Sequence, residues 1–169
     1  MVICMKEIYL GRQPVYDPAL RVEGYQLSYH PTERGDVLED APMLDMELMH
    51  TRTLFNTLTE IGLEQLAGDG KVFLSVAREL LVQGMLQQLM PPSPRMVFEV
   101  VADIMVDEPL REALNTLREQ GYRFLLDEYV DSDACRALLD AADSVRINVS
   151  LLPEPAALLR VAQLQDRGL

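Results

Sequence analysis

Acidic residues end two short apolar segments of this chain, and they are its most informative feature. The first segment, Met96 to Val100, carries Glu99 near its end. The second, Tyr122 to Glu128, ends in Asp127 and Glu128. A continuous apolar run is typical of a strand that is buried on both faces of a parallel sheet. Because barrel enzymes carry out their chemistry at the carboxyl ends of parallel strands, the sequence predicts an α/β scaffold with an acidic site at its strand tips.

The rest of the chain supplies the elements that would hold such a site. From Lys71 onward strands and helices alternate, which predicts a parallel sheet with right-handed crossovers. Strands are expected at 71–76, 96–101, 122–127 and 144–149, and helices at 78–90 with a break at Gly84, between Asp107 and Gly121, from Ser132 or Asp133, and at 153–167. Residues 7–16 and 21–29 predict a strand pair, the first at an edge because of Pro14. A long amphipathic helix is expected at about 42–61.

Composition limits the class of protein. The 169 residues, 49% of them hydrophobic, fit one domain over 1–169. A net charge of −12 repels the phosphates of nucleic acids, so we expect no nucleic-acid partner. Cys4 and Cys135 show neither metal-ligand spacing nor a disulfide framework, which predicts reduced thiols in a cytoplasmic protein. No apolar run approaches the roughly 20 residues of a membrane span, so no membrane partner is expected.

Motifs along nearly the whole chain resemble those of the EAL family, cyclic di-GMP phosphodiesterases built on a modified (β/α)8 barrel. The likeness is strongest to the degenerate EAL half of signalling proteins that join it to a modified HD output domain, known as EAL–HDOD proteins. In chain order, the motifs are Gly11-Arg-Gln-Pro-Val-Tyr-Asp17, Val22-Glu-Gly-Tyr-Gln-Leu27, Phe73-Leu-Ser-Val-Ala-Arg-Glu-Leu-Leu81, Phe98-Glu-Val-Val-Ala-Asp103, Gly121-Tyr-Arg-Phe-Leu-Leu-Asp-Glu-Tyr129 and Asp143-Ser-Val-Arg-Ile-Asn148. The resemblance implies a TIM-like barrel of EAL type.

Most functional positions of that family are changed in this chain. Only Glu99 and Asp127 keep the family's residue types at metal-binding positions. At the other positions this chain has a different residue from the family. In chain order, Gln26 stands in place of the glutamate that names the family, His30 in place of the substrate arginine, Ser75 in place of a metal-binding asparagine, Ala102 in place of the second glutamate of the ELTE motif, Glu128 in place of the second paired aspartate, Arg146 in place of the water-activating lysine and Asn148 in place of the next aspartate.

These replacements remove chemistry that a two-metal hydrolase needs. Such an enzyme gathers anionic oxygens around two cations, and magnesium demands strict octahedral geometry. Gln26 lacks a negative charge, Ser75 lacks a carbonyl, and the longer Glu128 displaces its oxygens. Arg146 cannot lose its proton near neutral pH and so cannot act as a general base. We therefore expect no catalytic residues and no cofactor, with magnesium relevant only if activity survives.

The charged residues that remain allow alternative roles. Glu99 and Asp127 could still hold one weakly bound metal ion, or they could be remnants that are hydrogen-bonded or solvated. We favour remnants. Arg146 could contact a phosphate as a planar fork, or it could pair with Asp127 or Glu128. We prefer the pairing, because an unpaired carboxylate in a closed barrel mouth is costly.

The length of the chain limits the barrel. A (β/α)8 barrel usually needs about 250 residues, and this chain supplies about five barrel strands plus an amino-terminal edge strand. We expect a partial, carboxyl-terminally truncated barrel whose open edge recruits a partner or aggregates. The chain could be a fragment of a longer protein, pair with a second copy, or form an open sheet. We expect a homodimer.

The expected function is that of a catalytically inactive EAL-like module that acts by protein contact in bacterial signalling. Its partner would be an output domain, another regulator or a second copy. One alternative is a weak magnesium-dependent cyclic di-GMP phosphodiesterase. A second is a module that binds cyclic di-GMP without cutting it, although His30 at the position of the substrate arginine and the negative net charge disfavour an anionic ligand.

Overall fold

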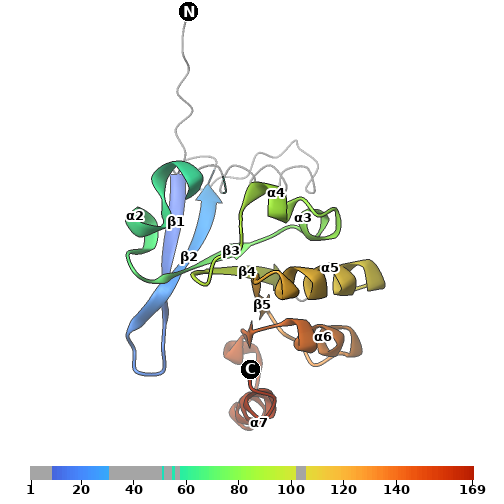
Figure 1. Cartoon of the computed structure of the whole chain (residues 1–169). Coiled ribbons are helices and arrows are strands. Elements are labelled where there is room, and N and C mark those ends of the chain that lie inside the picture. Colours follow the sequence, from blue (N-terminus) through green and yellow to red (C-terminus); the bar gives the residue numbers. More distant parts are fainter. Residues whose placement is uncertain (1–8, 31–50, 52–54, 56–57, 102–105) are drawn as a thin grey trace, which may run out of the picture.

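The computed structural model describes residues 9–30, 51, 55, 58–101 and 106–169. Six strands in these ranges form one sheet in chain order. The strands are β1 (Tyr9–Tyr16), β2 (Val22–His30), β3 (Lys71–Ser75), β4 (Met96–Val101), β5 (Arg123–Asp127) and β6 (Ser144–Val145). β1 is antiparallel to β2, and the strands from β2 to β6 are mutually parallel. The α/β fold is therefore a partial (β/α)8 barrel with five barrel strands and an edge strand, as predicted (Figure 1).

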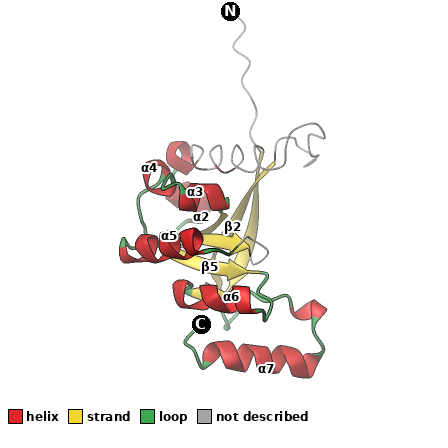
Figure 2. Ribbon diagram, turned by 90° about the vertical axis from the view of Figure 1, so that its right-hand side faces the viewer, coloured by secondary structure: helices red, strands yellow, loops and turns green. Residues whose placement is uncertain are grey.

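Helices line one side of this sheet, which we call its outer face. Figure 2 shows α3, α5 and α6 stacked along that face, with α7 beyond α6. The helices are α2 (Leu63–Ala67), α3 (Arg78–Val82), α4 (Leu86–Leu89), α5 (Glu108–Glu119), α6 (Asp133–Leu138) and α7 (Glu154–Gln165), with short 3-10 turns η1 (Leu139–Ala141) and η2 (Val149–Leu151). Thr51, Phe55 and residues 58–61 are also helical, in agreement with the predicted long helix, the remainder of which lies outside the described residues.

The structure departs from the predicted elements at two places. β6 ends after Val145 instead of reaching Val149. At the end of the predicted strand, the side chain of Asn148 accepts a hydrogen bond from the backbone N–H of Ser150 at 3.2 Å and caps η2. Helix α2 was not predicted, since its five residues are too few to display a hydrophobic repeat. The predicted break at Gly84 is confirmed, and this residue has a φ of 65°.

Two apolar clusters form on opposite faces of the sheet. On the outer face, the ring centroid of Phe98 lies 6.1 Å from the ring centroid of Phe55 and 6.2 Å from that of Phe124. On the inner face, Phe73, Val97 and Leu125 form a smaller cluster. Neighbouring residues of a strand point to opposite faces, so strands buried on both sides are apolar throughout.

Asp107 joins α5 to α3 through hydrogen bonds. Its side chain accepts the backbone N–H of Leu110 at 3.1 Å and so caps α5. Its Oδ2 also accepts a hydrogen bond from Nη2 of Arg78, at the start of α3, at 2.5 Å. The hydrogen bond from Arg78, only partly opposed by desolvation, holds the pKa of Asp107 below its usual value of 3.8. Because the folded pKa lies below the unfolded one, this stabilisation is present above the unfolded value and disappears as pH falls through the folded pKa.

We expect Asp107→Asn to lower the free energy of unfolding modestly at neutral pH, because asparagine keeps the cap but not the charge. The difference from wild type should shrink as pH falls below 3.8 and disappear once Asp107 is protonated in the folded state. Urea unfolding followed by circular dichroism, at neutral pH and over a series of acidic pH values, measures it. Glu119→Gln, in the last turn of the same helix, is the matched control and should change little. A difference for Asp107→Asn that stayed constant with pH would contradict this role for the charge.

Candidate functional site

Five polar side chains meet on the inner face of the sheet, towards the carboxyl ends of the strands. The first four come from successive strands and the last from the segment after β6: Gln26, Ser75, Glu99, Asp127 and Arg146. Strand register brings them together, because Ser75 pairs directly with Glu99, and Gln26 pairs with the inner-face residue Phe73. We call these five residues the bridged cluster.

Glu99 lies at the centre of the bridged cluster and is fully buried. Its Oε2 accepts a hydrogen bond from Nε2 of Gln26 at 2.7 Å and another from Oγ of Ser75 at 3.2 Å. Its Oε1 accepts a bond from Nη2 of Arg146 at 2.5 Å. Both oxygens of this buried carboxylate are therefore occupied by protein donors, as a buried charge requires.

Arg146 bridges the two carboxylates of the cluster. While Nη2 binds Glu99, Nη1 donates to Oδ2 of Asp127 at 2.9 Å. The other oxygen of Asp127 accepts the backbone N–H of Glu128 at 2.9 Å. The backbone of Arg146 is itself fixed, since its N–H donates a hydrogen bond to the carbonyl oxygen of Leu126 at 2.9 Å. All four carboxylate oxygens thus accept a hydrogen bond, and two of them accept it from one guanidinium.

The predicted pairing of Arg146 is confirmed for Asp127, but its second partner is Glu99 and not Glu128. Glu128 lies outside the bridged cluster with an exposed side chain and a φ of 51°. This left-handed backbone is unusual for a residue other than glycine and turns the chain away after β5. Asn148 caps η2 and makes no contact with the cluster among the described interactions.

Other predicted positions give less information. His30 ends β2, but its side chain is outside the described set, and Ala102 lies in the undescribed range 102–105. Sequence reasoning missed the role of Gln26 and Ser75 as hydrogen-bond donors to Glu99. The available signal was that Ser75 lies on the strand next to that of Glu99 and Gln26 on the strand beyond it. Among the described residues, no group of three or more His, Cys, Asp or Glu is placed to hold a metal ion.

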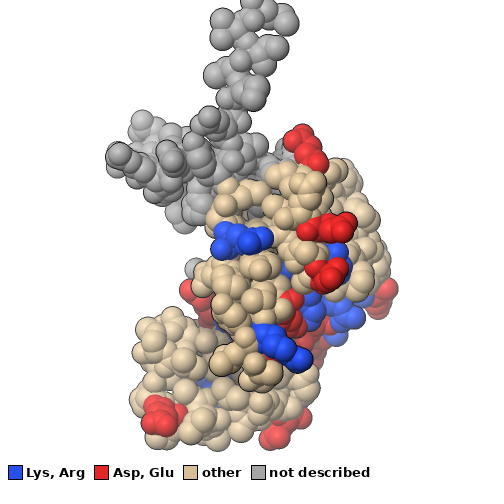
Figure 3. Space-filling model, turned by 90° about the vertical axis from the view of Figure 1, so that its left-hand side faces the viewer, with Lys and Arg blue, Asp and Glu red and all other residues tan. Residues whose placement is uncertain are grey.

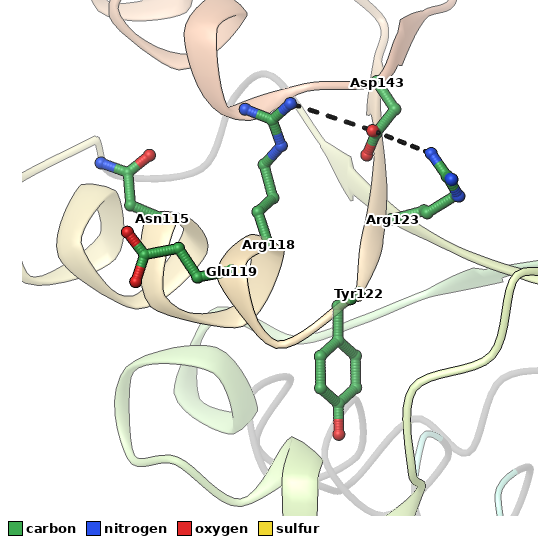
Figure 4. Close-up of a pocket in the computed structure, with 7 residues that line it drawn as sticks. Asn115, Arg118, Glu119, Tyr122, Arg123 and Asp143 are labelled. Carbon is green, nitrogen blue, oxygen red and sulfur yellow. Dashed lines mark hydrogen bonds and ion pairs between the residues drawn. The ribbon is translucent and has the colours of Figure 1, made fainter.

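A hollow of about 500 Å³ lies at the opposite end of β5 from the bridged cluster. Figure 4 shows the carboxylate of Asp143 there, between Arg118 and Arg123. Its ion pairs with them measure 3.9 and 3.3 Å, and it also accepts the backbone N–H of Phe124 at 2.8 Å. These bonds tie α5 and β5 to the start of β6, so the hollow contains a structural ion-pair network.

Comparison with known proteins identifies a curated relative and solved structures of similar fold. No family model matches the chain. The cyclic di-GMP phosphodiesterase CdgJ of Vibrio cholerae serotype O1 is 23% identical over 145 residues, which cover 86% of this chain and 32% of CdgJ. The EAL domain of Mycobacterium smegmatis DcpA gives a TM-score of 0.68 at 15% identity, over 96% of this chain and 79% of that one. The calcium and cyclic di-GMP complex of Klebsiella pneumoniae BlrP1 gives 0.63 at 16% identity, over 87% of this chain and 41% of that one.

These similarities concern the fold. The chain spans about a third of the length of the curated relative that it matches, 32% of CdgJ. Within the part of the chain that the structure describes, there is no helix with the length and apolar character needed to cross a membrane.

Proposed function

We propose that this chain, which has the fold of EAL domains, is a catalytically inactive module of bacterial cyclic di-GMP-related signalling that acts through protein contacts. The observation that carries the proposal is the bridge from Arg146 to Glu99 and Asp127. A guanidinium lies between the two carboxylates that the resemblance assigns to metal binding. The domain would then be one EAL-like unit over 1–169.

The bridge opposes metal-dependent hydrolysis in two ways. A divalent cation would have to replace Arg146 at both carboxylates, because their four oxygens are already hydrogen-bonded. Magnesium also needs a near-octahedral set of oxygens, whereas Gln26 presents a donor to the cluster. In addition, Arg146 stays protonated at neutral pH and cannot activate a water molecule. We therefore assign the cluster a structural role.

The enzyme alternative is supported by the relatives themselves. CdgJ is named a cyclic di-GMP phosphodiesterase, and the BlrP1 structure contains calcium with the dinucleotide. If Arg146 moved aside in this chain, Glu99 and Asp127 would become available to a cation. The two readings differ in one measurable property, which is whether magnesium and cyclic di-GMP bind together.

We expect isothermal titration of the purified chain with cyclic di-GMP to give no binding heat up to high micromolar ligand, with or without magnesium. The reason is that the carboxylates are bonded to the protein's own arginine and the net charge of −12 gives no long-range attraction for an anion. An active EAL phosphodiesterase titrated alongside serves as the positive control.

Magnesium-dependent binding would contradict the proposal and favour the phosphodiesterase, with product analysis as the next step. Binding that is unchanged without magnesium would instead favour the non-hydrolysing sensor. In either case, Glu99→Ala would show whether the ligand uses the bridged cluster, and Glu119→Ala, on the exposed surface of α5, is the matched control.

A further inference from the structure

Two hollows adjoin at the end of the molecule where α6 and α7 lie one beyond the other (Figure 2). The larger, of about 520 Å³, is lined by residues of both helices, and the smaller, of about 290 Å³, lies between the segment after β5 and η2. Tyr129, Asp131 and Arg160 line both hollows, so together they form one depression, which we call the α6–α7 groove. The larger hollow alone is within the roughly 300–1,000 Å³ of small-molecule sites.

The smaller hollow has mainly apolar walls. Its apolar residues are Tyr129, Val130, Leu151 and Leu152. Val130 is 65% exposed and Leu151 is 78% exposed, so the hollow opens to solvent past two large apolar side chains. The wall is held in place, because the positive φ of Glu128 turns the chain after β5 and the backbone N–H of Tyr129 donates to the carbonyl oxygen of Arg146 at 3.0 Å. Such a recess is suited to the apolar part of a ligand.

The larger hollow is positively charged. Three guanidinium groups line it, those of Arg136, Arg160 and Arg167, together with two carboxylates, those of Asp131 and Asp166, which gives the lining a net charge of +1. The chain as a whole has a net charge of −12. On the face in Figure 3, charged side chains are sparse toward the lower end of the molecule, where Figure 1 shows α7. The groove therefore offers an anion a local attraction that the chain as a whole does not.

Arg160 has donors that a ligand can use. Its Nη2 pairs with Oδ2 of Asp131 at 3.3 Å, and its guanidinium carbon lies 5.7 Å from the ring centroid of Tyr129. A guanidinium carries N–H donors on each of its nitrogens, and the others of Arg160 bond to none of the described residues. Asp131 would keep a partner if Arg160 turned to a ligand, because its Oδ1 accepts a bond from Nη1 of Arg136 at 2.5 Å. Within the described part of the chain, the side chain of Arg167 has no ion pair.

We infer that the α6–α7 groove binds a small amphipathic carboxylate. Arg160 binds the acid group on the side of the larger hollow, where Arg167 adds positive charge, and the smaller hollow holds the apolar part. The planar guanidinium matches a carboxylate as a fork. A ligand with a single negative charge fits best, since the net charge of −12 opposes each further one. The groove includes no residue of the bridged cluster, so the inference goes beyond the proposed function and does not depend on it.

Isothermal titration of the purified chain with 2-naphthoate, and with the uncharged 2-naphthamide, tests the inference. We expect a dissociation constant on the order of 100 μM for 2-naphthoate, as is usual for a ligand of this size. The amide should bind at least about tenfold more weakly, because it lacks the charge that strengthens a hydrogen bond to arginine. Arg160→Gln should weaken 2-naphthoate at least about tenfold and remove the difference between the two compounds. Leu151→Ser should weaken both, by at least about threefold.

Arg111→Gln and Leu20→Ser are the matched controls. Arg111 lies on the surface of α5, and Leu20 is 82% exposed at the tip of the β1–β2 hairpin, so both variants should bind 2-naphthoate like wild type. Circular dichroism checks that the variants fold. If Arg160→Gln does not fold, Arg167→Gln keeps the test valid, because it breaks no ion pair with the described residues, and it should weaken 2-naphthoate by at least about threefold.

Three outcomes would overturn the inference. The first is no binding of 2-naphthoate up to millimolar concentration. The second is binding that Arg160→Gln leaves unchanged, which would place the anion elsewhere on the chain. The third is equal binding of the acid and the amide, which would show that the groove does not recognise a carboxylate.

Discussion

Arg146→Ala should lower the free energy of unfolding by about 2–4 kcal/mol, because it leaves the buried Glu99 carboxylate without its cationic partner. Glu99 is 0% exposed, so water cannot replace the guanidinium freely. Asp127 loses the same partner. This range lies somewhat below the roughly 3–5 kcal/mol usual for breaking a buried pair, since the side chain of Arg146 is itself 33% exposed.

Urea unfolding followed by far-ultraviolet circular dichroism measures this loss, as the chain has no tryptophan to report it by fluorescence. The double variant Arg146→Ala with Glu99→Gln should recover much of the stability, because a neutral amide tolerates burial better than an unpaired carboxylate. Millimolar magnesium should stabilise Arg146→Ala more than wild type if the guanidinium occupies the place of a cation.

Arg111→Ala is the matched control for the loss of an arginine. Arg111 pairs with Glu108 at 2.9 Å on the surface of α5, and such pairs contribute about 0–1 kcal/mol. Equal destabilisation by the two substitutions, or no recovery in the double variant, would show that the bridge does not compensate a buried charge.

The elements that carry the site were predictable from local sequence patterns. β4 and β5 are continuous apolar runs because both faces are buried, and Asp107 signals the start of α5 by its capping side chain. The short β6 was not predictable in the same way. Its extended pattern continues in the sequence to Val149, but β6 stops at Val145 and the Asn148 side chain caps η2 within the predicted strand.

The contacts within the site depend on distant parts of the chain, which explains why two roles stayed open for Glu99. Its donors are 73, 24 and 47 residues away in sequence, in Gln26, Ser75 and Arg146. Residue types alone showed only that the charge of a carboxylate at the strand tips could be neutralised by a nearby arginine. Only the strand register and the position of the segment after β6 show that Arg146 reaches both carboxylates.

The outward face of α7 illustrates another limit of sequence reasoning. A helix at 153–167 was expected, and α7 occupies Glu154–Gln165. Apolar residues occur on all sides of it, so periodicity alone does not say which side packs against the rest of the molecule. The structure buries Leu164 and leaves Leu158 and Leu159 exposed.

Gly24→Ala should destabilise the fold by at least about 2 kcal/mol, because β2 and β3 approach too closely at this residue for a side chain. A Cβ atom there would lie 2.3 Å from the carbonyl oxygen of Lys71, its partner in the strand register. The obstacle is backbone, so it cannot turn aside as a side chain could. Relief requires β2 to separate from β3, and that would also move Gln26 away from Glu99.

Gly68→Ala distinguishes this clash from the general cost of replacing a glycine. Gly68 has a φ of 55° and a ψ of −129°, a backbone conformation that glycine adopts far more readily than other residues, and nothing lies within 4 Å of its ideal Cβ position. Its substitution therefore costs backbone strain without a clash. Urea unfolding of the two variants and the wild type gives the comparison. If Gly24→Ala left the free energy of unfolding near that of the wild type, the spacing of β2 and β3 would not be fixed by the absence of a side chain. A loss of at least about 2 kcal/mol would instead mean that the glycine of the Val22–Leu27 motif is required to bring Gln26 within bonding distance of the buried carboxylate.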